Sequence, residues 1–213
     1  MKIVKVSALP MSAPVPEEKR HRTDLGTKVK SDATLIRVAT DSGLTGIGAA
    51  LGTPPIVAAI VQHELAAECV DENPMFSERI YERMYNGSRS SSVASHRLMK
   101  ADAAASSWRA LPASTSRCGM SRRKHSEFHS TRRSALFGAL CAASIHVAMA
   151  AANCHILEVT QGYMPMMWDL FNEPFDIRPN GMVHAPERPG LGFTLRADAL
   201  ERFRYVDGPE FEF

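Results

Sequence analysis

A segment without hydrophobic periodicity, residues 90–133, interrupts the chain. Eleven of its 44 residues are serine, nine are lysine or arginine, and two, Asp102 and Glu127, are acidic. A segment with neither a period of 2 nor one of 3.6 builds neither a half-buried strand nor an amphipathic helix. The sequence therefore predicts a compact unit at 1–89, an irregular or disordered basic segment at 90–133, and a second ordered unit at 134–213.

The charge is as uneven as the hydrophobicity. Residues 90–133 carry a formal charge of +7 and the rest of the chain −5, although the net charge is only +2. Clustered basic residues favour nucleic acid, so one interpretation is a small α+β binding protein whose basic middle contacts nucleic acid or acidic lipid. Trp108 and Phe128 are too few aromatic residues for a base-stacking platform. A solvated irregular segment is therefore favoured over a nucleic-acid partner.

The length excludes one architecture directly. A complete (β/α)₈ barrel takes about 250 residues, so 213 residues are too few for a barrel with a second domain. The four cysteines have no CxxC or other metal-ligand spacing, and the N-terminal residues lack the apolar stretch of a secretory signal. Because a bilayer span takes about 20 strongly apolar residues, the alanine-rich window 135–152 predicts a buried helix. We predict a cytoplasmic protein with reduced thiols and no membrane contact.

The N-terminal unit has the pattern of an α+β structure. Three β-branched or alternating stretches predict strands, with a turn at Asp41-Ser42-Gly43, and apolar residues at helical spacing follow two proline signals. The polar connection 11–30 predicts a long loop that is either flexible or a lid. The predicted strands are 2–6, 34–38 and 45–48, and the predicted helices follow Pro55, with Ile56, Ile60, Val61 and Leu65, and Pro74, with Phe76, Ile80 and Met84.

The sequence pattern of the C-terminal unit predicts a helix, a strand and a second helix. The alanine-rich stretch from Ser134 predicts the first helix, and residues 156–159 (ILEV) predict a short apolar strand. Residues 196–204 predict a short amphipathic helix with Leu200 and Phe203 on one side. No GxGxxG, CxxC or HExxH motif assigns a function. His155 and Glu158 would lie on opposite faces of a strand, which disfavours a shared metal ion.

The two ordered ends resemble one family. The N-terminal end contains IRVATDSGLTGIG, DENPMFSERIYERMY and NGSR, and the C-terminal end contains HVAMAAANCHILE and MMWDLFNEPFDIRPNGMVHAPERPGLGF. These motifs resemble the mandelate racemase and muconate-lactonising branch of the enolase superfamily, over about four fifths of the chain. The resemblance implies an α+β capping domain of the enolase-superfamily type. It also implies a fragment of a (β/α) barrel, comprising its final helix, its last strand and the C-terminal return to the cap.

The resemblance also implies a chemistry. Family enzymes bind Mg²⁺ and abstract the proton alpha to a carboxylate, and the most similar members are acid-sugar dehydratases, which are lyases, and racemases. The metal stabilises the enediolate while a Lys or His base takes the proton. A small acid-sugar substrate and a homo-oligomer are the implied partners. The family's Lys-x-Lys motif, acidic metal ligands and His base have no match in residues 90–133. We therefore expect no metal ligands and no activity.

Four residues carry over as candidate site residues. Glu158 matches the acidic residue that ends the eighth barrel strand and hydrogen-bonds the substrate carboxylate in the transition state. Arg20, His21 and Arg22 lie in the counterpart of the cap loop that closes over substrate, and are the candidate substrate contacts. The triplet Gly48-Ala49-Ala50 departs from the family, which has a glutamate after the glycine.

The genetic code gives the middle segment a second interpretation. With suitable synonymous codons, residues 105–120 read from the third base encode IIVAGIAGIDIALWD, and residues 120–131 continue as VAAKALGIPLY. Only the first base of each new codon is a free choice of wobble base; the others come mostly from the existing residues. The peptide is the apolar helix pattern that the family places at the barrel entrance. We hypothesise a frameshift followed by a deletion of most of the barrel. Codons for residues 106–120 that do not encode this peptide one frame over would refute it.

A third interpretation is an unstable product. A last strand without its barrel neighbours leaves an exposed edge. The same loss would expose apolar side chains at Met164, Met166, Met167 and Trp168.

Overall fold

The computed structural model describes most of the chain outside its middle. The described residues are 1–86, 137–150, 154, 156–159 and 162–213. The predicted basic segment 90–133, its reading frame and its contact with nucleic acid lie outside them.

The chain divides into two compact units. The first comprises Met1–Pro10 and Ala33–Pro112, and the second Met11–Asp32 and Ala113–Phe213. Residues 11–32 are thus grouped with the C-terminal unit, although they precede most of the first unit in sequence. The domain boundaries drawn from composition fall in residues outside the described part and stay a prediction.

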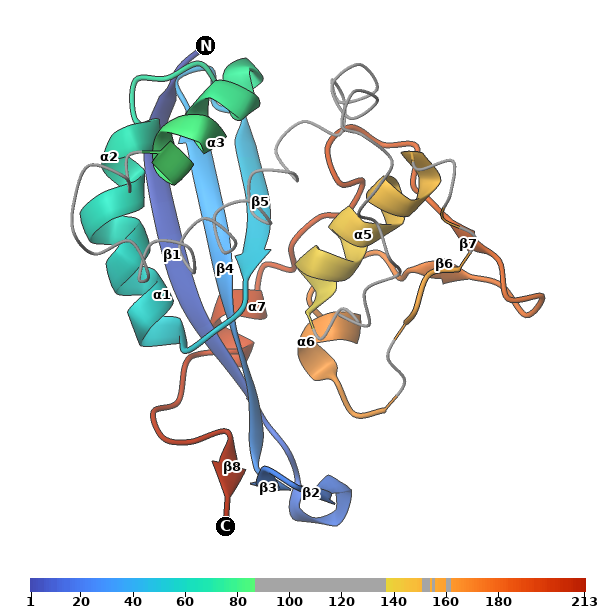
Figure 1. Cartoon of the computed structure of the whole chain (residues 1–213). Coiled ribbons are helices and arrows are strands. Elements are labelled where there is room, and N and C mark those ends of the chain that lie inside the picture. Colours follow the sequence, from blue (N-terminus) through green and yellow to red (C-terminus); the bar gives the residue numbers. More distant parts are fainter. Residues whose placement is uncertain (87–136, 151–153, 155, 160–161) are drawn as a thin grey trace. The chain divides into compact units, whose positions relative to one another are not determined.

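The first unit is built on a three-stranded sheet. Strands β1 (Ile3–Pro14), β4 (Lys30–Thr40) and β5 (Thr45–Ala50) lie in the order β1-β4-β5 (Figure 1). β4 and β5 pair antiparallel from Thr34↔Ala50 to Ala39↔Thr45. Gly43 in their turn has φ +82°, which glycine adopts without strain. The predicted hairpin is confirmed.

Helices cover one face of this sheet (Figure 1). The first helical stretch runs through α1 (Pro54–Ile60), a π-helical segment (Val61–Leu65) and α2 (Ala66–Cys69). A 3-10 turn (Pro74–Phe76) then leads into α3 (Ser77–Asn86). Both predicted helices are confirmed.

The buried faces of these helices differ in part from the prediction. Val61, Leu65, Ile80 and Met84 are buried in the core of the first unit, as predicted. Ile56 and Phe76 are instead exposed, because Val57 fills the core position that Ile56 was expected to take, and Phe76 lies in the 3-10 turn before α3. The same core contains residues of the sheet, Ile3, Ala8, Ile36, Val38 and Ala50, and further residues of the helices, Val57, Ala58 and Cys69.

The predicted loop 11–30 is wrong in its larger part. β1 continues to Pro14, and the short strands β2 (Arg22–Thr23) and β3 (Gly26–Lys28) follow. β3 also pairs antiparallel with β8 (Phe211–Glu212), giving a second sheet in the order β2-β3-β8. A strand whose partner lies at the opposite end of the sequence leaves no local signal, so the polar composition favoured a loop.

The second unit contains the predicted alanine-rich helix, α5 (Gly138–Ala150), and the short helix α6 (Pro165–Trp168). A β-carbon added at Gly138 would lie 2.9 Å from the carbonyl oxygen of Met167, so the backbones of α5 and α6 approach closely. The strands β6 (Asp176–Ile177) and β7 (Val183–His184) and the helix α7 (Ala199–Arg202) complete the unit. No helix among the described residues is both long and apolar enough to cross a membrane.

The methionines after residue 163 do not form the predicted exposed surface. Met166 and Met167 are 1% and 0% exposed, and Met164 and Trp168 are partly buried. Met167 packs with Cys141 and Ile145 of α5. The expectation of exposure assumed that the barrel remnant has nothing to pack against, whereas α5 covers this segment.

Two other C-terminal predictions are corrected. Residues 156–159 form no strand: Ile156 is 79% exposed, while Leu157 and Val159 pack against the cluster around Met167. A strand is stabilised by ladder hydrogen bonds to its neighbours, which apolar composition alone does not provide. The predicted helix at 196–204 shortens to α7, with Phe203 buried and Leu200 exposed.

Candidate functional site

The candidate catalytic residue, Glu158, lies on an irregular segment. Its side chain is exposed, and the backbone around it is not a strand. A solvated carboxylate on such a backbone is not preorganised to stabilise a transition state. Its neighbour His155 lies outside the described residues, so the predicted lack of a shared metal is untested. The catalytic role of Glu158 stays a prediction.

The three candidate substrate contacts lie on one hairpin of the second unit. Arg20, His21 and Arg22 follow the 3-10 turn Glu17–Lys19, and all three are exposed. The Arg20 Nε donates to the carbonyl of Val15 over 3.2 Å. The His21 carbonyl accepts from the Lys28 amide over 3.1 Å, so it helps to close the hairpin.

A contact that sequence reasoning missed links this hairpin to the chain after Glu158. The Nζ of Lys19 lies 4.4 Å from the ring centroid of Tyr163, a cation–π distance. The hairpin and the C-terminal segment therefore meet within the second unit. No sequence signal pairs a lysine with an aromatic residue so far along the chain.

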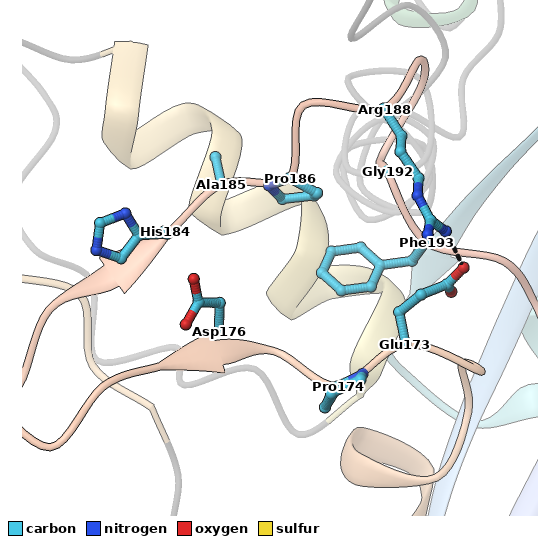
Figure 2. A pocket seen from close by; sticks show the side chains of 9 residues that line it. All are labelled: Glu173, Pro174, Asp176, His184, Ala185, Pro186, Arg188, Gly192 and Phe193. Carbon is cyan, nitrogen blue, oxygen red and sulfur yellow. Dashed lines mark hydrogen bonds and ion pairs between the residues drawn. The ribbon is translucent and has the colours of Figure 1, made fainter.

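The second unit also has a pocket of about 210 Å³. Figure 2 shows Phe193 and Pro186 between two charged ends, one with Glu173 and Arg188 and the other with Asp176 and His184. The remaining lining residues are Pro174, Ala185 and Gly192. Sequence reasoning missed this pocket, because residues 173–193 read only as turns and as a family motif.

Both carboxylates of the pocket already have partners. Glu173 pairs with Arg188 and accepts a hydrogen bond from the Thr194 amide over 2.7 Å. Asp176 is paired with Arg178 over 3.3 Å and lies opposite His184 in the β6–β7 register. This pocket therefore offers an exposed imidazole beside two carboxylates that are neutralised by arginines, which is a weak arrangement for proton abstraction.

The lowered pKa of Glu173 makes the stability of the protein at acidic pH a test of the contacts that this carboxylate forms. The hydrogen bond from the Thr194 amide, with a smaller contribution from Arg188, lowers the pKa of Glu173 below its ordinary 4.5. The contribution of the ionised Glu173 to the free energy of unfolding is complete above its unfolded-state pKa. It is lost as the pH falls through its folded-state pKa. We expect the stability advantage of the natural chain over Glu173→Gln to shrink below about pH 4.5.

The measurement is the urea midpoint of both chains at several pH values between neutral and strongly acidic. Glu187→Gln, at an exposed glutamate of the same loop, is the control. An equal difference between the natural chain and Glu173→Gln at every pH would contradict the assignment.

The described residues contain no group of side chains that fits the magnesium site implied by the family resemblance. Mg²⁺ binds through carboxylate oxygens in an octahedral arrangement. No cluster of three or more His, Cys, Asp or Glu side chains suited to a metal ion occurs within the described ranges. The two acidic residues of the middle segment, Asp102 and Glu127, fall outside those ranges.

Part of the chain is similar to a known protein family. Residues 125–199 match the family described as enolase C-terminal domain-like. A comparison with curated proteins gives no match.

The fold has a relative among solved structures. A member of the enolase superfamily from Polaromonas sp. JS666 aligns with a TM-score of 0.78 and 14% identity, over 100% of both chains. A putative mandelate racemase from Bordetella bronchiseptica RB50 is 24% identical over 44% of this chain and 24% of its own (TM-score 0.41). A muconate lactonizing enzyme from Mycobacterium smegmatis is 27% identical over 39% and 24% (TM-score 0.35). The chain thus spans about a quarter of the length of these two enzymes.

The family resemblance is confirmed at two levels. The Polaromonas structure shows the fold, and the match over residues 125–199 is specific to the C-terminal domain. The chain therefore has the fold of this enolase-superfamily structure, and its residues 125–199 are similar to the enolase C-terminal domain-like family.

Proposed function

We propose that this chain derives from a magnesium-dependent acid-sugar dehydratase or racemase and does not itself abstract the α-proton. The observation that carries the proposal is the place of Glu158, the one catalytic position that the family resemblance transfers. It is an exposed carboxylate on an irregular segment. The sequence adds that residues 90–133 contain two acidic residues and no Lys-x-Lys motif.

The energetics support the same proposal. Removing a proton alpha to a carboxylate produces an enediolate, whose charge must be stabilised while a base holds the proton. One hydrogen-bonding carboxylate supplies neither. Enzymes lower such barriers by about 8–23 kcal/mol, and an exposed glutamate in water supplies a small part of that.

The parts of the site that remain favour binding over catalysis. Arg20, His21 and Arg22 offer cationic and hydrogen-bonding groups to a carboxylate or hydroxyl, so a small acid sugar is the ligand class of this proposal. The lineage further favours a cytoplasmic homo-oligomer. A weakly held acid sugar on this exposed hairpin would be bound without being converted.

The test is turnover by the purified full chain. We expect the chain with Mg²⁺ and a panel of acid sugars to give the same rate of 2-keto product as a Glu158→Gln control. Turnover above that control would refute the proposal. Binding of the same sugars, followed by calorimetry on the natural chain and on Arg22→Gln, separates a retained ligand contact from lost chemistry.

A further inference from the structure

The C-terminal segment 203–212 meets the hairpin of residues 11–32 along most of its length. The two stretches lie at opposite ends of the sequence but in the same compact unit. We infer that residues 203–212, which we call the strap, hold this hairpin in its folded position. The contacts of the buried Lys30 ammonium are the ones on which this attachment depends. The inference concerns a conformational device and does not depend on the proposed function.

Lys30 is almost completely buried, and its contacts lie on both sides of the junction. Its side chain is 7% exposed, and its Nζ lies 2.9 Å from an oxygen of Asp32. The same Nζ donates to the backbone carbonyl of Val206 in the strap over 2.5 Å and lies 5.0 Å from the ring centroid of Tyr205. An ammonium has three hydrogen-bond donors, so the Lys30 group contacts Asp32 of the hairpin and Val206 of the strap at the same time.

The partner carboxylate extends the same network. The Ser12 hydroxyl donates to Asp32 over 2.6 Å and accepts from the Val206 amide over 3.1 Å. The Asp32 amide in turn donates to the Glu210 carboxylate over 2.6 Å. Buried polar groups of this kind stabilise a structure only while every partner is present.

Backbone pairing continues the contact toward the tip of the hairpin. The Val29 amide donates to the carbonyl of Glu210 over 2.9 Å, and β3 pairs with β8. Gly26 has φ +107°, and a β-carbon there would lie 2.6 Å from the carbonyl oxygen of Glu212. Glycine is required at this position both by its backbone conformation and by the close approach of the strap.

Phe203, at the start of the strap, is buried, but beyond it hydrophobic burial contributes little. Val206 is 49% exposed, and Tyr205 and Phe211 are only partly buried. Because the strap beyond Phe203 buries so little apolar surface, the contact of residues 205–212 with the hairpin depends on the polar network around Lys30. Loss of that network therefore releases the strap and frees the hairpin that carries Arg20–Arg22.

Hydrogen exchange of the full-length chain tests the lock. In Lys30→Met, we expect amides of the strap and of residues 26–29 to exchange at least tenfold faster, with amides of the paired part of the β4–β5 hairpin, residues 34–50, unchanged. Lys28→Met, a lysine of the same hairpin that lies 5.9 Å from the ring centroid of Phe211, is the matched control. Unchanged exchange in the strap, or an equal rise throughout the chain, would overturn the inference.

A second variant guards against a folding defect in Lys30→Met. Gly26→Ala leaves Lys30 intact and pushes β8 away from β3. It should therefore speed exchange at Val29, whose amide donates to Glu210, while Ser12 and Asp32 stay protected. Adding Lys30→Met to it should then release Ser12 and Asp32 as well. If Gly26→Ala alone releases the whole strap, the pairing of β3 with β8 is the fastening and the role given to Lys30 is wrong.

Discussion

Replacing Met167 with alanine should lower the free energy of unfolding of the C-terminal unit by about 2–5 kcal/mol. Met167 is 0% exposed and packs against Cys141 and Ile145. Truncation removes buried apolar area and leaves a cavity that the close approach of α5 to α6 at Gly138 prevents from collapsing. The measurement is urea unfolding followed by Trp168 fluorescence. A Trp108→Phe background removes the other of the two tryptophans.

The control for this prediction is Met182→Ala. Met182 is 57% exposed between β6 and β7, so its truncation should change stability by less than about 0.5 kcal/mol. The comparison also decides between a packed C-terminal unit and the unstable product considered from sequence. If both variants unfold at the same urea concentration as the parent chain, the segment is not packed.

Replacing Asp32 with leucine should cost about 3–5 kcal/mol, because it leaves the buried ammonium of Lys30 without its counter-charge. Asp32 and Lys30 are each 7% exposed and 2.9 Å apart. The double variant Asp32→Leu, Lys30→Met should be less destabilised than the sum of the single variants, since an apolar pair leaves no uncompensated charge. A double-mutant cycle in the same fluorescence assay measures this coupling.

An exposed ion pair of the same unit provides the comparison. Asp176 and Arg178 are 52% and 53% exposed and lie 3.3 Å apart, so Asp176→Ala should cost at most about 1 kcal/mol. Equal losses for Asp32→Leu and Asp176→Ala would mean that burial of the first pair has no energetic consequence. Additive losses in the cycle would contradict direct coupling between Lys30 and Asp32.

Local sequence patterns predicted the elements whose stability is local. The turn at Asp41-Ser42-Gly43 and the apolar residues at Val61 and Leu65 act within one hairpin or one helix, so their periodicity is visible in sequence. Residues 156–159 are the counterexample: their composition favours a strand, but a strand also needs partners. Composition likewise did not predict that Met166 and Met167 have a packing partner, although both are buried and Met167 packs against α5.

The candidate site divides in the same way. Motif resemblance located Glu158 and the Arg20–Arg22 stretch, but it gave neither the irregular backbone around the first nor the exposure of all four residues. The pocket at Glu173 and His184 depends on the pairing of β6 with β7 and on the return of Phe193, which bring separate turns together. Such juxtapositions have no signature in a single stretch of sequence.

The sequence by itself determined the family resemblance, the local hairpin and helix patterns of its ordered ends, and the basic composition of the segment between them. These features follow from motifs, periodicity and charge, each of which is a property of neighbouring residues. Only the tertiary structure decided that residues 11–32 form a hairpin fastened by the C-terminal strap. The contacts that do this, from Lys30 to Val206 and from Ser12 to Val206, join residues 176 and 194 positions apart. Folding brings them together because a buried charge is stable only beside its partners.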